Sequence, residues 1–338
     1  MNEKPAVKPK RKIFKIFLAI IGVIIAFNLL VIAAGTVLRA AYFKGQYAKI
    51  MPYGKLVDVY DGKMHVYSAG SGSKTIVLIP GMGIALPSAD FGPLMRKLAE
   101  KNTAVCVEYF GTGFSSGTKR ERTCANYTEE IREALKKGGF KPPYVLMAHS
   151  ISSVYAEYYA AAYPREVTGI ISLDGTGTGY YEKMPDSVKK ILPLAKLQQS
   201  TGVTGLLAAL ITDKKKLLGS GYTGKEINDM IVFAAFTIND TLIEQILNSS
   251  EAIKEVMDMP YPESVPYFKI ISKQTYETPN AQLKMTPQEY QKMHLDRIGK
   301  HAKYEILDGS HFIYLNNTGK IAAITDAFLK QPVWQANK

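Results

Sequence analysis

One stretch, Tyr144–Tyr155, constrains the fold of this chain more than any other. It begins as an unbroken apolar run, which indicates a strand buried on both faces, and it continues into apolar and small residues typical of a packed helix that ends at Pro164. A serine, Ser150, stands where the strand meets the helix, which is the arrangement of a nucleophile elbow. The crowded turn needs small residues on both sides. Ala148 and Ser152 are small but are not glycine, so the match to Gly-x-Ser-x-Gly is relaxed.

A second constraint lies near the N-terminus. Residues 16–38 are almost entirely apolar, and about twenty such residues cross the hydrocarbon core of a bilayer as a helix. Residues 1–15 before them carry six basic side chains and one acidic side chain. The positive-inside rule therefore predicts a cytoplasmic N-terminus and an extracytoplasmic domain on a single-pass cell-membrane anchor. A cleaved signal peptide is the alternative, although the apolar run is longer than a usual signal core.

Composition restricts the partners and cofactors. The net charge is +12, of which the N-terminal tail supplies about +5, and the remainder forms a basic surface without the motifs of nucleic-acid binding. The two cysteines, Cys106 and Cys124, form no Cys-x-x-Cys pair or Cys/His cluster. Gly111 to Gly113 is too short for a dinucleotide motif. We expect no nucleic-acid partner, no metal and no cofactor.

After a connector over residues 39–54, strands and helices alternate. This alternation predicts an α/β fold, a doubly wound and mostly parallel sheet with helices on both faces. The predicted strands are 56–60 and 64–68, joined by an Asp61-Gly62 hairpin turn, followed by 75–79, 104–109, 144–149, 167–173, 265–272 and 304–307. The predicted helices of the sheet region are 91–101, 128–137, 154–163, 287–300 and 321–329.

The alternation stops between residues 175 and 262, where no strong strand is predicted. Four helices are expected there instead, at 187–197, 203–211, 223–236 and 240–256, and Thr223 with Glu226 forms a capping-box pattern. We interpret this segment, called the helical insertion below, as a lid over the sheet. The sheet domain is then divided into residues 55–174 and 263–332.

Four motifs occur in the chain in a specific order. They are Ile79–Gly83, Tyr109–Ser115, Ala148–Ser152 and Gly309–Phe312, each following a predicted strand. In this order, over residues 56–330, the sequence resembles the α/β-hydrolase superfamily. The resemblance implies acyl transfer through a serine nucleophile, a histidine base and an acid.

The resemblance assigns Ser150 as the nucleophile and His311, after the last strand, as the base. The other four histidines fit less well. His65 lies too early in the chain, and His149 is expected to point away from the serine. His294 and His301, in or beside a predicted helix, are expected to be solvated.

The same resemblance offers two positions for the acid. Asp174 ends the strand that follows the elbow helix, and Glu277 lies after the next strand; Asp174 is preferred. The oxyanion hole would use the main-chain N–H groups of Met82 and Ile151. Pro80-Gly81 stands where His-Gly is common in the family, so the Met82 donor depends on the local backbone.

The sequence thus predicts a membrane-anchored serine esterase or lipase-like enzyme that acts on a small-molecule or lipid-like acyl ester. Two alternatives remain. A non-catalytic binding or sensor protein could use the same scaffold. A proline-type aminopeptidase would need an acidic group in the lid for the substrate amine, and the candidates are Asp213, Glu226, Asp229, Asp240 and Glu244.

Overall fold

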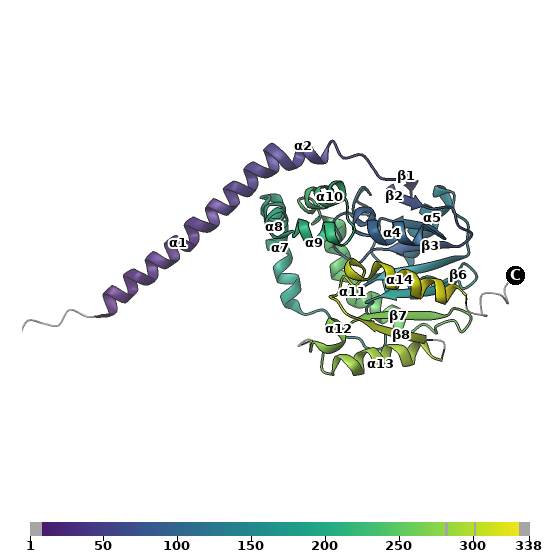
Figure 1. Ribbon diagram of the computed structural model, residues 1–338. Coiled ribbons are helices and arrows are strands. Elements are labelled where there is room, and N and C mark those ends of the chain that lie inside the picture. The colour runs from purple at the N-terminus through teal and green to yellow at the C-terminus, as the bar shows by residue number, and fades with distance from the viewer. Residues whose placement is uncertain (1–8, 281–282, 301, 331–338) are drawn as a thin grey trace, which may run out of the picture.

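The computed structural model describes residues 9–280, 283–300 and 302–330 (Figure 1), so most of the basic tail and His301 lie outside the described residues. A sheet of eight strands in the order β1-β2-β4-β3-β5-β6-β7-β8 forms its centre. β1 pairs antiparallel with β2 and β2 with β4, and all other neighbours are parallel. The strands are β1 (Lys55–Val59), β2 (Gly62–Ala69), β3 (Thr75–Ile79), β4 (Thr103–Val107), β5 (Tyr144–His149), β6 (Val167–Leu173), β7 (Tyr267–Ser272) and β8 (Ala302–Leu307).

The first hairpin turns one residue earlier than predicted. Val59 pairs with Gly62, so the two turn residues are Tyr60 and Asp61 rather than Asp61 and Gly62. Tyr60 has φ +47°, the left-handed conformation that tight hairpin turns require. Asp61 accepts hydrogen bonds from the hydroxyl of Thr118 and the amide of Lys119 instead of forming the expected Asp-Gly turn.

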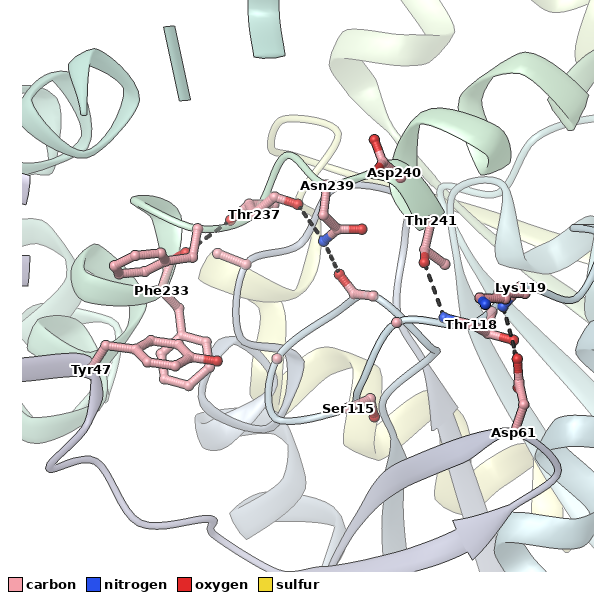
Figure 2. A pocket seen from close by; sticks show the side chains of 15 residues that line it. Tyr47, Asp61, Ser115, Thr118, Lys119, Phe233, Thr237, Asn239, Asp240 and Thr241 are labelled. Atoms are coloured by element: carbon pink, nitrogen blue, oxygen red, sulfur yellow. Dashed lines mark hydrogen bonds between the residues drawn. The ribbon is translucent and has the colours of Figure 1, made fainter. Parts of the chain in front are cut away.

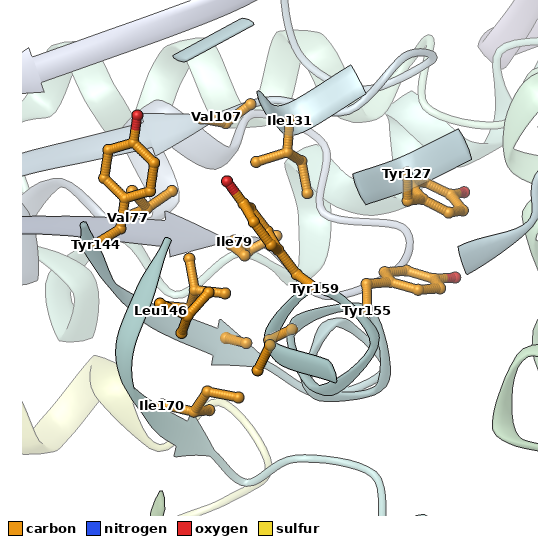
Figure 3. Close-up of a cluster of buried hydrophobic side chains, with 14 of the residues drawn as sticks. Val77, Ile79, Val107, Tyr127, Ile131, Tyr144, Leu146, Tyr155, Tyr159 and Ile170 are labelled. Carbon is orange, nitrogen blue, oxygen red and sulfur yellow. The ribbon is translucent and has the colours of Figure 1, made fainter. Parts of the chain in front are cut away.

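Helices cover both faces of the sheet because successive strand residues point to opposite sides. Val77 and Ile79 pack with α5 and α6 in one buried cluster, and Figure 3 shows Tyr127 of α5 and Tyr155 of α6 in it. Ile76 and Leu78, the alternate residues of β3, pack with α4 and α14 on the other face. This two-sided packing confirms the predicted fold class.

The helices of the sheet region are in part longer than predicted. α5 begins at Cys124 rather than Thr128, because the Thr123 hydroxyl accepts from the amide of Asn126 and caps the helix. α14 begins at Tyr314, and a non-helical Asn317 bends it. The full set is α3 (Pro87–Asp90), α4 (Gly92–Leu98), α5 (Cys124–Gly138), α6 (Ser152–Ala162), α12 (Lys273–Glu277), α13 (Pro287–Ile298) and α14 (Tyr314–Leu329).

The helical insertion separates β6 from β7, and its described backbone contains helices and no strand. The capping box of Thr223 and Glu226 is present at the start of α10. A short helix, α9, was not predicted; the Asp213 side chain caps it by accepting from the amide of Lys216. The helices are α7 (Asp186–Ser200), α8 (Val203–Ile211), α9 (Lys214–Gly219), α10 (Gly224–Ala234) and α11 (Asp240–Met257).

The N-terminal apolar run forms one long helix, α1 (Pro9–Leu38), that projects away from the sheet domain (Figure 1). It continues through a short π-helical segment, η1 (Arg39–Phe43), into α2 (Lys44–Tyr47). Residues Ile13–Tyr47 are long and apolar enough to cross a membrane, and the apolar window within them is not buried in the protein.

Candidate active site

Ser150 lies in the sharp turn between β5 and α6. Its φ of +57° is unusual for a residue with a side chain and marks local strain. The turn is held by main-chain hydrogen bonds: the Ser150 amide donates to the oxygen of Leu173 at 3.2 Å, and the Ser150 oxygen accepts from the amide of Thr176 at 3.0 Å. Both partners belong to the end of β6 and the loop after it. The neighbouring strand therefore fixes the elbow.

The two non-glycine residues of the elbow fit in different ways. Ala148 is fully buried. The Ser152 hydroxyl is also buried; it donates to the oxygen of Pro80 and lies 2.5 Å from the hydroxyl of Tyr109. Ser152 thereby ties the elbow to the loops that follow β3 and β4. A serine is compatible with this position because its polar atom is satisfied.

His311 and Asp174 complete a hydrogen-bonded chain with the serine. His311 Nε2 lies 2.9 Å from the Oγ of Ser150, and its Nδ1 lies 2.7 Å from Oδ2 of Asp174. Asp174 is buried, whereas the His311 side chain is 43% exposed. The three residues come from the carboxyl ends of β5, β6 and β8, which is where a parallel sheet collects its functional groups.

Three further donors hold the carboxylate of Asp174. The Ser272 amide donates to Oδ1 at 2.7 Å, while the hydroxyls of Ser272 and Thr275 donate to Oδ2 at 3.1 and 2.6 Å. These donors fix the position of the carboxylate beside His311 Nδ1, and the carboxylate orients the ring so that Nε2 faces the serine.

Structure comparisons identify the fold. An esterase from Exiguobacterium antarcticum superposes with a TM-score of 0.60 at 16% identity, covering 82% of this chain and 100% of that chain. The carboxylesterase CesB of Bacillus subtilis gives a TM-score of 0.58 at 17% identity, covering 87% of this chain and 98% of that chain. Both likenesses show that this chain has the α/β-hydrolase fold.

Sequence comparison places this chain in one family with an uncharacterized protein, YbdG of Bacillus subtilis. The two are 32% identical over 232 residues, which is 68% of this chain and 69% of YbdG. No family model matches the chain.

The two candidate acids of this α/β-hydrolase are in different surroundings. Asp174 contacts His311, whereas Glu277 is exposed at the end of α12. The helix that carries Glu277 instead supplies a donor to the carboxylate of Asp174, through Thr275. The structure therefore brings Asp174, and not Glu277, to the histidine.

Two of the other histidines have neighbours that the sequence did not indicate. The ring of His149 lies 4.8 Å from the ring of His311, centroid to centroid, and no hydrogen bond joins it to the Ser150 hydroxyl among the described residues. His294 was predicted to be solvated, and that prediction is wrong because it is fully buried. Its Nε2 lies 2.9 Å from Glu157 of α6 and its Nδ1 lies 2.7 Å from Lys269 of β7. Burial and the nearby lysine lower the pKa of His294 to about 4.

The proposed oxyanion donors lie on the two segments that flank Ser150. Among the described residues, no protein acceptor is found for the amide of Met82 or for that of Ile151. Gly81 lets the loop approach the elbow, since a Cβ there would lie 2.5 Å from the Nδ1 of His149. The α6 helix begins directly after Ile151, and its N-terminal end favours negative charge.

A pocket with a volume of about 730 Å³ lies outside the hydrogen-bonded chain of Ser150, His311 and Asp174 (Figure 2). Figure 2 shows Tyr47 and Phe233 on one side of it and Asn239, Thr241 and Lys119 on the other. Neither Ser150 nor His311 lines it.

A smaller pocket, of about 470 Å³, borders the site: it is lined by His311, Thr275 and Tyr290 among others, so it opens on the exposed edge of the imidazole. Another, of about 240 Å³, is lined by none of the three residues, but its lining includes Phe312, the residue after His311, and residues of the helical insertion. No group of three or more His, Cys, Asp or Glu side chains that could hold a metal is found in the part of the chain that the structure describes.

Proposed function

We propose that this α/β-hydrolase is a membrane-anchored serine hydrolase that cleaves an acyl ester. Ser150 is the nucleophile, His311 the general base and Asp174 the acid that orients the base. The observation that carries the proposal is the hydrogen-bonded chain from Asp174 through His311 to a strained Ser150, with distances of 2.7 and 2.9 Å. Nucleophile and base within hydrogen-bond reach, with the base oriented by a third group, is the geometry that activates a serine hydroxyl.

The reaction follows from these positions. Ser150 Oγ bonds to the ester carbonyl carbon while its proton passes to Nε2 of His311, and the charged imidazole is stabilised by Asp174. The oxygen of the tetrahedral intermediate receives hydrogen bonds from the amides of Met82 and Ile151. The intermediate expels the alcohol, which takes the proton from His311 and leaves an acyl-enzyme. A water molecule, deprotonated by the same imidazole, then releases the acid.

The membrane anchor is supported by α1. Its apolar side chains face away from the protein, as in Val23 at 69% and Leu30 at 71% exposed, and such exposure over a long helix is expected in lipid rather than in water. We infer that residues 16–38 span the cell membrane and that the catalytic domain lies outside. Alkaline extraction tests this: retention in the membrane with an intact N-terminus supports an anchor, and release with a shortened N-terminus indicates a signal peptide.

Esters are preferred over N-terminal proline peptides because the acids that could bind a substrate amine have other roles. The carboxylate of Glu226 pairs with Arg96 and caps α10, and that of Asp229 accepts from the hydroxyl of Tyr53. Asp213 caps α9, and Asp240 pairs with Lys196. Glu244 lines a separate pocket with Arg122.

A fluorophosphonate probe tests the nucleophile directly. The wild-type protein should be labelled and should hydrolyse short acyl esters, and Ser150→Ala should lose both properties. A panel of acyl esters and proline anilides distinguishes the two substrate classes. Ester hydrolysis that persists in Ser150→Ala would reject the assignment, and a wild-type protein inactive on every substrate would favour the non-catalytic alternative.

A further inference from the structure

Exposed apolar side chains are concentrated on three consecutive helices of the insertion. Those of α7 and α8 follow helical spacing, so each of these two helices presents one stripe to solvent. Leu210 and Ile211 are the most exposed, at 71% and 78%. We call this set the apolar edge; its members are Ile191, Leu194, Leu197, Leu207, Leu210, Ile211 and Leu218. Such a concentration of exposed apolar side chains indicates a contact surface for another apolar body.

The apolar edge is fixed next to the membrane anchor. Gly35 of α1 packs directly on the start of α8, so closely that a Cβ there would lie 2.8 Å from the oxygen of Thr201 and 2.9 Å from the nitrogen of Val203. The guanidinium of Arg39 donates to the main-chain oxygens of Gln199 and Ala235. In Figure 1, α7 and α8 lie on the side of the domain from which α1 projects.

This junction sets the depth of the insertion relative to a bilayer. α1 has 30 residues and is about 45 Å long, more than the ~30 Å hydrocarbon core. The contact with α8 is at Gly35, near the C-terminal end of α1. If α1 crosses the membrane, α8 therefore lies at the level of the outer headgroups, where the apolar edge can enter the lipid.

Lysines flank the apolar edge. Lys214, Lys215 and Lys216 are exposed on α9, and Lys189 and Lys190 are exposed on α7. Apolar side chains bordered by lysines are typical of helices that lie in the surface of an anionic bilayer, where the lysines are attracted by the negatively charged headgroups. The charge thus favours an anionic lipid surface over a protein partner as the occupant.

A mostly apolar pocket, called the crevice below, lies between the helices that carry the apolar edge and the loop after β8. The pocket of about 240 Å³ is lined by Ala208 of α8, Leu217 of α9 and Ile231 of α10, and by Phe312 and Leu315, with Asp90 and Thr212 as its polar members. Phe312 is the residue after His311, so one wall of the crevice is adjacent in sequence to the proposed base.

We propose that the apolar edge rests in the surface of an anionic lipid bilayer beside α1, and that the crevice behind it receives the acyl chain of a lipid ester from that bilayer. The proposal rests on the proposed anchor and hydrolase function and specifies the substrate as a membrane-borne ester. It explains why a hydrolase would keep its insertion docked on its own anchor. The substrate then diffuses in the bilayer and reaches the site without crossing water.

Docking is tested on the full-length protein in vesicles of phosphatidylcholine and phosphatidylglycerol. A fluorophore is attached at Leu210→Cys, and its quenching by nitroxide-labelled lipids is compared with that at Lys136→Cys on α5, an exposed position away from the insertion. The native Cys106 and Cys124 are buried, and unlabelled wild-type protein gives their background. We expect at least fivefold stronger quenching at position 210. Equal quenching at the two positions would overturn the proposal.

Activity separates docking from catalysis. The variant Leu210→Asp/Ile211→Asp should hydrolyse a fluorogenic palmitoyl ester dissolved in vesicles at least tenfold more slowly than wild type, with the soluble acetyl ester unchanged within twofold. If the variant hydrolyses both esters more slowly by the same factor, the result counts against docking. If wild type cleaves neither ester while quenching at position 210 persists, the hydrolase function fails and the docking stands. If both esters are cleaved without quenching, only the docking fails.

Discussion

The imidazole of His149 packs against that of His311, and its Nε2 lies 3.0 Å from the main-chain oxygen of His311. Burial and the proximity of His311 lower the pKa of His149 to about 4, so the ring is neutral at pH 7. Its Nδ1 is buried without a hydrogen-bond partner among the described residues. The single proton is therefore on Nε2 and is donated to His311, which makes His149 a positioning residue for the base.

His149→Phe keeps a ring and removes that donor. Loss of one neutral hydrogen bond of about 1 kcal/mol should lower kcat roughly fivefold. KM should stay within twofold because the substrate does not contact this buried ring. His149→Gln, which retains an N–H donor, should recover part of kcat. A change in KM with kcat unchanged would contradict a positioning role.

Substitutions of Asp174 and Glu277 test which of the two residues is the acid of the proposed triad. Asp174→Asn removes the charge that stabilises the protonated imidazole and leaves an amide that favours the wrong tautomer, so kcat should fall by roughly 10³ to 10⁴. Glu277→Gln changes an exposed side chain and should remain within twofold of wild type. Steady-state kinetics on a soluble ester measures both variants. If kcat fell by a similar small factor in both variants, Asp174 would be rejected as the acid.

The sequence predicted most of the sheet and the three residues of the hydrogen-bonded chain because both depend on local patterns. Strands β3 to β7 are mostly apolar runs that end at turns; Ser150 and Asp174 follow strand ends directly, and His311 lies in the loop after β8. The carboxyl ends of parallel strands meet at one edge, so the order of strands was enough to bring these side chains together.

What the sequence could not show depends on contacts between distant segments. His294 lies on the predicted α13, but its partners Glu157 and Lys269 belong to α6 and β7, so its burial is visible only in the folded chain. A signal was present: Lys269 interrupts an otherwise apolar buried strand, and a buried lysine needs a partner. The short helices α9 and α12 lack the periodic pattern that identifies longer ones.

Ser152 offers a stability test of the elbow. Its hydroxyl donates to the oxygen of Pro80 and contacts that of Tyr109, all buried. Ser152→Ala leaves two polar groups unpaired and should lower the free energy of unfolding by about 1–3 kcal/mol. Tyr109→Phe removes the hydroxyl that Ser152→Ala leaves unpaired. The double variant should therefore lose less unfolding free energy than the sum of the losses in the two single variants. Urea unfolding measures this cycle, and strict additivity would mean that the contact contributes nothing.

Asp90 should make stability depend on pH. Burial raises the pKa of its carboxyl from 3.8 to about 6 in the folded protein, although the hydroxyl of Tyr314 donates to it. Because the pKa of Asp90 is higher in the folded than in the unfolded protein, its contribution to the free energy of unfolding is fully present below pH 3.8. The contribution is lost as the pH rises through 6. The side chain of Asp90→Asn does not titrate, so this pH-dependent loss of stability is absent from the variant.

The measurable quantity is the difference in unfolding free energy between Asp90→Asn and wild type. As the pH rises from 4 to 7, the variant should gain at most about 3 kcal/mol of unfolding free energy relative to the wild type. Above pH 7 the difference should change little. Comparing the two proteins at each pH cancels the titration of all other groups. A difference that does not vary with pH would mean that water reaches the carboxylate through the crevice that it lines.

The last prediction concerns the junction of anchor and insertion. A Cβ at Gly35 would lie 2.8–2.9 Å from main-chain atoms of Thr201 and Val203, and main chain cannot move aside as a flexible side chain can. Gly22, in the same helix, has no atom within 4 Å of its Cβ position. Gly35→Ala and Gly22→Ala therefore add the same methyl group to the same helix, with a clash in only one case.

Overpacking at Gly35 should weaken the contact by about 1–3 kcal/mol, which corresponds to roughly a 5- to 150-fold increase in the rate of amide hydrogen exchange over α8. Gly22→Ala should leave that exchange unchanged. The measurement is made on the full-length protein in nanodiscs, with exchange over α5 as the internal reference. If both variants exchange like wild type, α8 does not pack on the anchor in the bilayer, and the insertion is free to move relative to α1.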